Sequence, residues 1–203
     1  MFDTHQPMLA QIGADSPAGF AAVAKLAVLS AQAPFARMDK ALRGAARRDF
    51  AGVSNVTATK RLGCAWLDAN AARLHRRLHR VWLGAPRGFE ADAMMYLMAC
   101  PGLGMVKAGF AAQMLLGVAG CLDTHNLTRL GLDPLLCVPG AFNTRARWTR
   151  LYRYLYWCER LGGARGLWND WCVWVAQTAP TRWPDPFSVS AWHVEVVDGN
   201  PLA

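Results

Sequence analysis

The tetrapeptide Pro-Gly-Leu-Gly at 101–104 most constrains how this chain can fold. Proline fixes its φ angle and glycine adopts positive φ angles that other residues rarely take, so these residues predict a tight turn. The preceding segment, 90–100, has a helical composition. The following segment, 105–116, is apolar almost all round and predicts a helix with one charge, Lys107, in its first turn. The sequence therefore predicts two helices joined by a glycine hairpin.

The start of the second helix is a candidate phosphate site. The first N–H groups of a helix have no intrahelical acceptor, and a hairpin containing Gly102 and Gly104 lets them face an anion together. Lys107 supports this hypothesis. A cation in the first turn opposes the helix macrodipole by up to ~1 kcal/mol, which is better explained if an anion binds there.

A second pattern, Asp-Thr-His-Asn at 123–126, predicts another helix that begins with Asp123 as its N-cap and ends at Gly131. A capping carboxylate can also accept a proton from water or from an amine. His125 and Asn126 lie in the same first turn and are candidate site residues. For both, the structural alternative is hydrogen bonding at the helix start.

Together the two patterns resemble the helix-hairpin-helix DNA glycosylase superfamily, over about 35 of the 203 residues. The matching residues are Pro101, Gly102, Leu103, Gly104 and Ala108 in the first pattern, and Asp123, Thr124, His125, Arg129, Gly131 and Leu132 in the second. The resemblance implies an all-α fold of that type. It also implies that Asp123 lies at the mouth of a pocket for a base turned out of DNA, where it activates a nucleophile and stabilises positive charge on the sugar.

One position departs from the family pattern. The Schiff-base lysine of bifunctional members lies four residues after the first glycine, where this chain has Val106. Lys107 is one residue further, about 100° around the helix. The sequence therefore argues against lyase chemistry through a lysine.

The wider motif, GLGMVKAGFAAQMLLG followed by GCLDTHN, is similar to a phage branch named for α-glutamyl/putrescinyl-thymine pyrophosphorylases, which includes amino acid:DNA transferases. This resemblance implies that the amine of an amino acid displaces pyrophosphate from pyrophosphorylated 5-hydroxymethyluracil in DNA. Asp123 would deprotonate the amine, while Lys107 and nearby arginines stabilise the leaving pyrophosphate. Two alternatives stay open: a monofunctional glycosylase in which Asp123 activates water, and a non-catalytic DNA-binding helical module.

The net charge of +8 favours a polyanionic partner. The candidate DNA-binding arginines are Arg73, Arg76, Arg77 and Arg80 on a predicted helix over 54–83, Arg129, and Arg147 and Arg150 on a predicted helix from Thr144 to the glycines at 162–163. On the last helix we expect Arg147, Arg150 and Tyr154 to share one face, suited to phosphate contact and base stacking. We expect the core side to contain Trp148, Leu151, Tyr152, Leu155 and Cys158. For each charged face, the alternative is a solvated surface.

Other segments complete the predicted fold. Ser16 and Pro17 predict the start of a helix over 18–31, and Pro34 predicts another that ends near residue 50. Ser54 is the expected cap of the helix over 54–83, with a break near Gly63 as an alternative. The expected apolar stripe of this helix is Leu67, Ala71, Leu74, Leu78 and Val81. Further expectations are a helix over 166–177 and a short strand or irregular cover over 189–197.

The chain is long and apolar enough, at 203 residues and 53% hydrophobic, for one domain or two packed helical halves spanning 1–203. Its longest uncharged run, 108–122, is too short to cross a bilayer, and no signal peptide is evident. We therefore expect a cytoplasmic monomer (in the host cytoplasm if a phage encodes it) with DNA and an amine as partners. The six cysteines show no paired spacing and are expected to be buried thiols. The His75 and His79 pair lacks further ligands at a metal spacing, so we expect neither a metal nor a cofactor.

Overall fold

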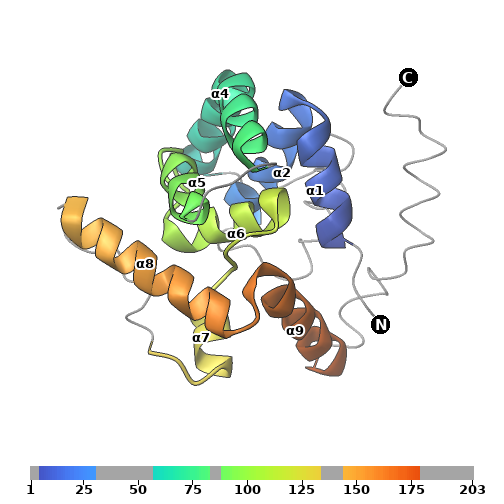
Figure 1. Ribbon diagram of the computed structural model, residues 1–203. Helices are drawn as coiled ribbons and strands as arrows, with labels where there is room; N and C mark the ends of the chain where they lie inside the picture. Colours follow the sequence, from blue (N-terminus) through green and yellow to red (C-terminus); the bar gives the residue numbers. More distant parts are fainter. Residues whose placement is uncertain (1–4, 31–56, 83–87, 134–143, 179–203) are drawn as a thin grey trace.

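The computed structural model describes residues 5–30, 57–82, 88–133 and 144–178, and every regular element in these ranges is an α-helix (Figure 1). The helices are α1 (His5–Asp15), α2 (Pro17–Ser30), α4 (Ala58–Trp82), α5 (Phe89–Leu97), α6 (Met105–Leu116), α7 (Thr124–Arg129), α8 (Thr144–Arg160) and α9 (Gly163–Thr178). The all-α prediction is confirmed for this part of the chain. The helix expected from Pro34, the strand or cover expected over 189–197, and Cys137 lie outside the described residues.

Two apolar helices, α2 and α6, form the centre of the protein, and α1 and α4 pack around α2 (Figure 1). Burial extends over almost all of α2 and over residues 108–116 of α6. A helix that is apolar all round has to be covered on every side, which explains this position. The predicted start of α2 is confirmed, because the Ser16 hydroxyl accepts a hydrogen bond from the backbone N of Gly19 at 3.1 Å. Helix α1 has no counterpart among the predicted helices.

Helix α4 is continuous through Gly63, so the alternative of a break near this residue is wrong. Gly63 instead provides room for the hairpin: a Cβ atom at this position would lie 2.4 Å from the backbone oxygen of Pro101. The helix is capped by Thr57, whose hydroxyl accepts a hydrogen bond from the backbone N of Lys60 at 3.3 Å, so Ser54 is not the cap of the observed helix. The predicted apolar stripe is confirmed at Leu67, Ala71, Leu74 and Leu78, which are buried.

The predicted core side of helix α8 is confirmed at Leu151 and Cys158, which are buried, and at Trp148 and Leu155, which pack partly buried against the core, but it is wrong at Tyr152. Tyr154 is fully buried, whereas Tyr152, which was expected in the core, is 56% exposed. Leu151, Tyr154 and Cys158 fall within about 60° of one another around the helix and pack inward. Tyr154 can be buried because its hydroxyl is hydrogen-bonded within the protein. The hydroxyl donates to the backbone O of Gly120 at 2.6 Å and accepts from the backbone N of Leu122 at 3.0 Å.

The cysteines of the described ranges are all free thiols, and Cys100, Cys158 and Cys172 are buried. Burial and, to a lesser extent, the neighbouring Cys64 raise the pKa of Cys100 to about 12. A thiol with so high a pKa stays protonated near neutral pH, so Cys100 cannot act as a thiolate nucleophile. Within the described residues, none of the helices combines the length and apolar character that a bilayer-crossing segment requires.

His79 is a titratable group in the interface between α1, α2 and α4. Its ring packs edge-on against Phe20, with ring centroids 5.8 Å apart, and its Nε2 atom is buried with no hydrogen-bond partner in the described part of the chain. Burial lowers the pKa of His79 below its ordinary value, and His75 lowers it further, against an opposing hydrogen bond to the backbone of Gly13. The folded protein therefore favours neutral His79.

This shift predicts acid sensitivity near neutral pH. Unfolded His79 binds its proton at a higher pH than folded His79, so its contribution to stability is complete above the unfolded pKa of about 6.5 and is lost as the pH falls through the folded pKa. Urea unfolding should show a free energy of unfolding that decreases between about pH 7.5 and pH 5.5. His79→Gln should reduce this decrease, and His125→Gln, at an exposed position, should preserve it. An unchanged pH profile in His79→Gln would contradict the assignment.

Candidate functional site

The hairpin between α5 and α6 is a type II turn. Gly102 has a φ angle of +85°, which the third residue of this turn requires, and the backbone N of Leu103 donates to the O of Cys100 at 3.1 Å. Cys100 and Leu103 are both 2% exposed, whereas Pro101 and Gly102 are exposed. The turn is thus anchored in the core by its two ends and presents its Pro-Gly tip to solvent.

The N-terminus of α6 has no side-chain cap. Gly104 is the N-cap residue in an extended conformation, and no acidic residue lies in the first turn. The first N–H groups of an α-helix have no intrahelical acceptor, so those that follow Gly104 can bind an anion. Lys107 is half-buried in this turn, with its Nζ atom 5.7 Å from the centre of the Phe110 ring. These features agree with the predicted phosphate site, which stays a prediction.

Lys60 is a second lysine near this turn and is not among the predicted site residues. It lies in the first turn of α4 beside Thr59, whose Cγ2 would be 3.4 Å from a Cβ atom at Gly102. Its Nζ atom donates to the backbone O of Leu29 at 3.1 Å. Partial burial lowers the pKa of Lys60, and the positive charge of Lys107 lowers it further. The two lysines are separated by 47 positions in the sequence, so no local pattern could have paired them.

This lysine pair predicts salt-dependent DNA binding. If each lysine contacts one phosphate, then Lys60→Gln and Lys107→Gln should each weaken binding of duplex DNA and each reduce the slope of log K against log salt by about 0.9. Fluorescence anisotropy titrations at several salt concentrations measure both quantities. Arg165→Gln, an equal charge change at an exposed position on α9, should leave the slope unchanged. Slopes equal to that of the wild type in both lysine variants would remove this site from the DNA interface.

The chain reverses after α6 and runs back along it. The backbone N of Val118 donates to the O of Ala112 at 3.4 Å, and two residues later the O of Gly120 lies against Gly109, where an added Cβ atom would come within 2.4 Å of it. This segment therefore runs toward the N-terminus of α6. Asp123 follows Gly120 by three residues, so chain reach places it within roughly 20 Å of the first turn of α6. The return path depends on Tyr154, whose hydroxyl holds Gly120 and Leu122.

Asp123 caps α7 as predicted. Its Oδ1 atom accepts a hydrogen bond from the backbone N of Asn126 at 3.0 Å, and its φ and ψ angles of −78° and 174° are those of an N-cap residue. The side chain is half-buried, and its second oxygen, Oδ2, has no hydrogen bond within the described ranges. His125 is exposed in the same turn. The carboxylate thus keeps one oxygen available for a proton.

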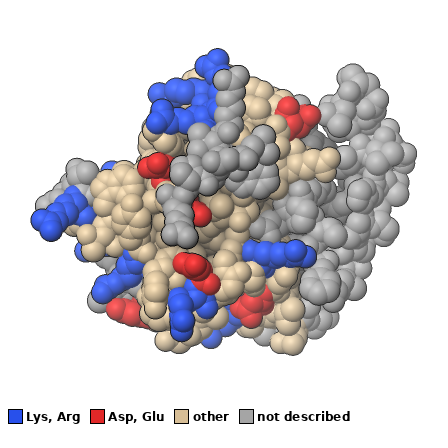
Figure 2. Space-filling model, viewed as in Figure 1, with Lys and Arg blue, Asp and Glu red and all other residues tan. Residues whose placement is uncertain are grey.

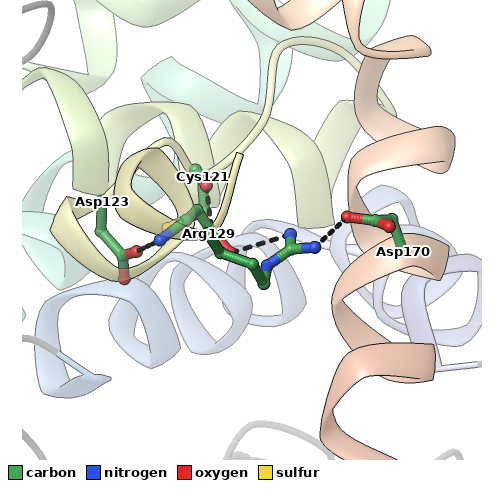
Figure 3. Close-up of polar contacts among 5 residues, drawn as sticks. Cys121, Asp123, Arg129 and Asp170 are labelled. Atoms are coloured by element: carbon green, nitrogen blue, oxygen red, sulfur yellow. Dashed lines mark hydrogen bonds and ion pairs between the residues drawn. The ribbon is translucent and has the colours of Figure 1, made fainter. Parts of the chain in front are cut away.

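Asn126 and Arg129 belong to a network that holds α7 against the rest of the protein (Figure 3). Asn126 is 7% exposed; its Nδ2 donates to the backbone O of Cys121 at 2.7 Å, and its Oδ1 accepts from Nη2 of Arg129 at 3.2 Å. Nη1 of Arg129 forms an ion pair with Asp170 on α9. These contacts give both residues a structural role. Their predicted roles, catalytic for Asn126 and DNA-binding for Arg129, stay predictions.

The remaining candidate arginines lie on α4 and α8. On α4, Arg73 and Arg76 are exposed, and the guanidinium of Arg77 lies 4.1 Å from the centre of the Tyr96 ring; the side chain of Arg80 is outside the described residues. Thr59 and Gly63 of α4 lie against the hairpin, and Arg73 is about 15 Å beyond Gly63 along the helix axis. Arg77 lies further along α4 but contacts Tyr96, in the last turn of the helix that leads into the hairpin.

On α8, Arg147 is exposed and Arg150 is half-buried. The prediction that Tyr154 is available beside them for base stacking is wrong, because Tyr154 is fully buried and hydrogen-bonded inside the protein. Stacking of a base on Tyr154 is therefore excluded. Arg147 and Arg150 themselves stay candidate phosphate contacts.

No group of three or more His, Cys, Asp or Glu side chains within the described ranges is arranged to hold a metal ion. Comparisons of the chain with protein-family models, with curated proteins and with solved structures found no match.

Proposed function

We propose that this protein is a DNA base-modifying enzyme of the helix-hairpin-helix, glycosylase-like type. In this proposal the hairpin at 101–104 and the first turn of α6 bind a DNA phosphate, with Lys60 and Lys107 adding positive charge. Asp123 then faces a pyrimidine that has been turned out of the base stack. The observation that supports the proposal most directly is the return of the chain along α6, which brings Asp123, with one oxygen unpartnered in the described structure, back toward the hairpin.

The proposed reaction is transfer of an amine, that of an amino acid, onto pyrophosphorylated 5-hydroxymethyluracil in DNA. The amine nitrogen attacks the 5-methylene carbon, and a new C–N bond forms as the C–O bond to pyrophosphate breaks. The electron pair of the broken bond leaves with the pyrophosphate oxygen. Asp123 accepts the proton of the attacking amine, and Lys107 stabilises the charge of the leaving group. This chemistry leaves the glycosidic bond intact and needs no lysine at position 106.

A direct assay tests this function. The protein is incubated with DNA that carries pyrophosphorylated 5-hydroxymethyluracil and with a mixture of amino acids, and the DNA is then digested and its nucleosides are weighed by mass spectrometry. A new aminoacyl nucleoside is the expected product. Free base together with abasic sites would instead identify a monofunctional glycosylase, in which Asp123 activates water. An unchanged nucleoside profile with retained DNA binding would identify a non-catalytic DNA-binding module.

A further inference from the structure

One face of α8 is exposed and carries arginines interleaved with tyrosines. The exposed residues of this face are Arg145, Thr149, Tyr152, Arg153, Tyr156 and Arg160, which fall within an arc of about 100°. Tyr152 is 56% exposed and Tyr156 is 55% exposed. Large aromatic side chains with this much exposure, one helical turn apart on one face, are typical of a binding surface rather than of a core.

The α8 face lies between two hollows. An arginine hollow of about 490 Å³ is lined by Arg145, Arg150 and Arg153, with Ala146 and Thr149. A tyrosine groove of about 450 Å³ lies on the other side, where Tyr152 and Tyr156 of α8 meet the start of α5, the loop at 117–119 and the start of α9. The helix therefore forms a ridge with a cationic hollow along one flank and an aromatic groove along the other.

The charges of the two hollows differ in sign. Arginine side chains line the first, whereas Glu90 and Glu159 line the second. Figure 2 shows basic side chains spaced along the region of α8, with acidic side chains beside some of them. A phosphate group is attracted by the arginine hollow and repelled by the carboxylates of the groove. An uncharged aromatic base is not repelled there and can stack on the exposed tyrosine rings.

We propose that the α8 face binds a single-stranded segment of DNA. Its phosphates contact Arg145, Arg153 and Arg160, and its unpaired bases stack on Tyr152 and Tyr156. The carboxylates of the tyrosine groove orient the strand, because they keep phosphates on the arginine side. The inference rests on the proposed function for the identity of the ligand as DNA. It adds a second contact surface, on a different helix from the hairpin, where an enzyme that unstacks a base can hold unpaired nucleotides.

Fluorescence anisotropy with a labelled single-stranded oligonucleotide of about 16 nucleotides tests the α8 face. Tyr152→Ala and Tyr156→Ala should each weaken binding roughly 5-fold or more, because stacking on an aromatic side chain contributes this much per base. Neither tyrosine variant should change the salt slope. The triple variant Arg145→Gln, Arg153→Gln, Arg160→Gln should reduce the slope of log K against log salt by about 2. Arg165→Gln is the matched control on α9, and thermal unfolding checks that each variant is folded.

The outcomes separate this inference from the proposed function. Variants of the α8 face that bind single strands as the wild type does would overturn the inference, while duplex binding that depends on Lys60 and Lys107 would leave the proposed function standing. A wild-type protein that binds neither single-stranded nor duplex DNA would overturn both. A salt slope that falls in the arginine variant, together with tyrosine variants of normal affinity, would overturn stacking and with it the single-strand assignment.

Discussion

Asp123→Asn should reduce amine transfer about 10²- to 10⁴-fold while leaving the protein folded. Asparagine caps a helix about as well as aspartate, so the hydrogen bond that Asp123 accepts from the backbone N of Asn126 can be kept. The substitution removes the negative charge and the capacity to accept a proton. Loss of the product in the nucleoside assay, together with an unchanged thermal unfolding curve, would identify the carboxylate as the proton acceptor.

Two further variants sharpen this test. Asp123→Ala should lose activity and also destabilise the protein by about 0.5–2 kcal/mol, because alanine cannot cap α7. Asp92→Asn makes the same chemical change at an exposed position in the first turn of α5 and should leave transfer unchanged. Full activity in Asp123→Asn would show that another group accepts the proton.

Gly109→Ala should destabilise the protein by about 2 kcal/mol or more and lower its melting temperature by roughly 4–8 °C. A Cβ atom at this position would lie 2.4 Å from the backbone O of Gly120 and 2.6 Å from the hydroxyl of Tyr154. The returning segment cannot make room without weakening the hydrogen bonds of Tyr154 to Gly120 and Leu122. The variant should therefore also displace Asp123 and lower transfer activity.

The expected destabilisation by Gly109→Ala is opposite in sign to the usual effect of this substitution. Replacing a glycine inside a helix with alanine normally stabilises the helix by up to ~1 kcal/mol. Gly13→Ala in α1 is the matched control, because the nearest atom to its added Cβ is the flexible end of Leu115, at 2.6 Å, rather than backbone. Gly13→Ala should cost clearly less than Gly109→Ala. A Gly109→Ala variant as stable as the wild type would contradict the close packing of the returning segment on α6.

Local chemistry allowed much of the fold to be predicted from the sequence. Pro101 and Gly102 form the expected turn, the apolar run after Gly104 forms α6, and Asp123 caps α7. Each of these features depends on a backbone preference or a hydrogen bond within a few residues. The buried stripe of α4 was predicted for a related reason, since the helical period places Leu67, Leu74 and Leu78 on one side.

The α8 face shows where the sequence was insufficient. Aromatic residues surround much of this helix, so its periodicity did not determine whether Tyr152 or Tyr154 is buried. The choice between Tyr152 and Tyr154 depended on hydrogen-bond partners in the segment at 120–122, more than 30 residues earlier in the chain. The exposed arginine–tyrosine face is consequently a finding of the structure.

The sequence by itself determined the elements that carry the candidate site: the hairpin, the start of α6 and the capping carboxylate at Asp123. Only the tertiary structure decided which other groups join them. It brought Lys60 to Lys107, returned Asp123 along α6, and placed Asn126 and Arg129 in contact with Cys121 and Asp170. The physical reason is the separation of the interacting residues along the sequence. Turns and caps form among neighbouring residues, whereas these contacts join residues whose proximity depends on how whole helices pack.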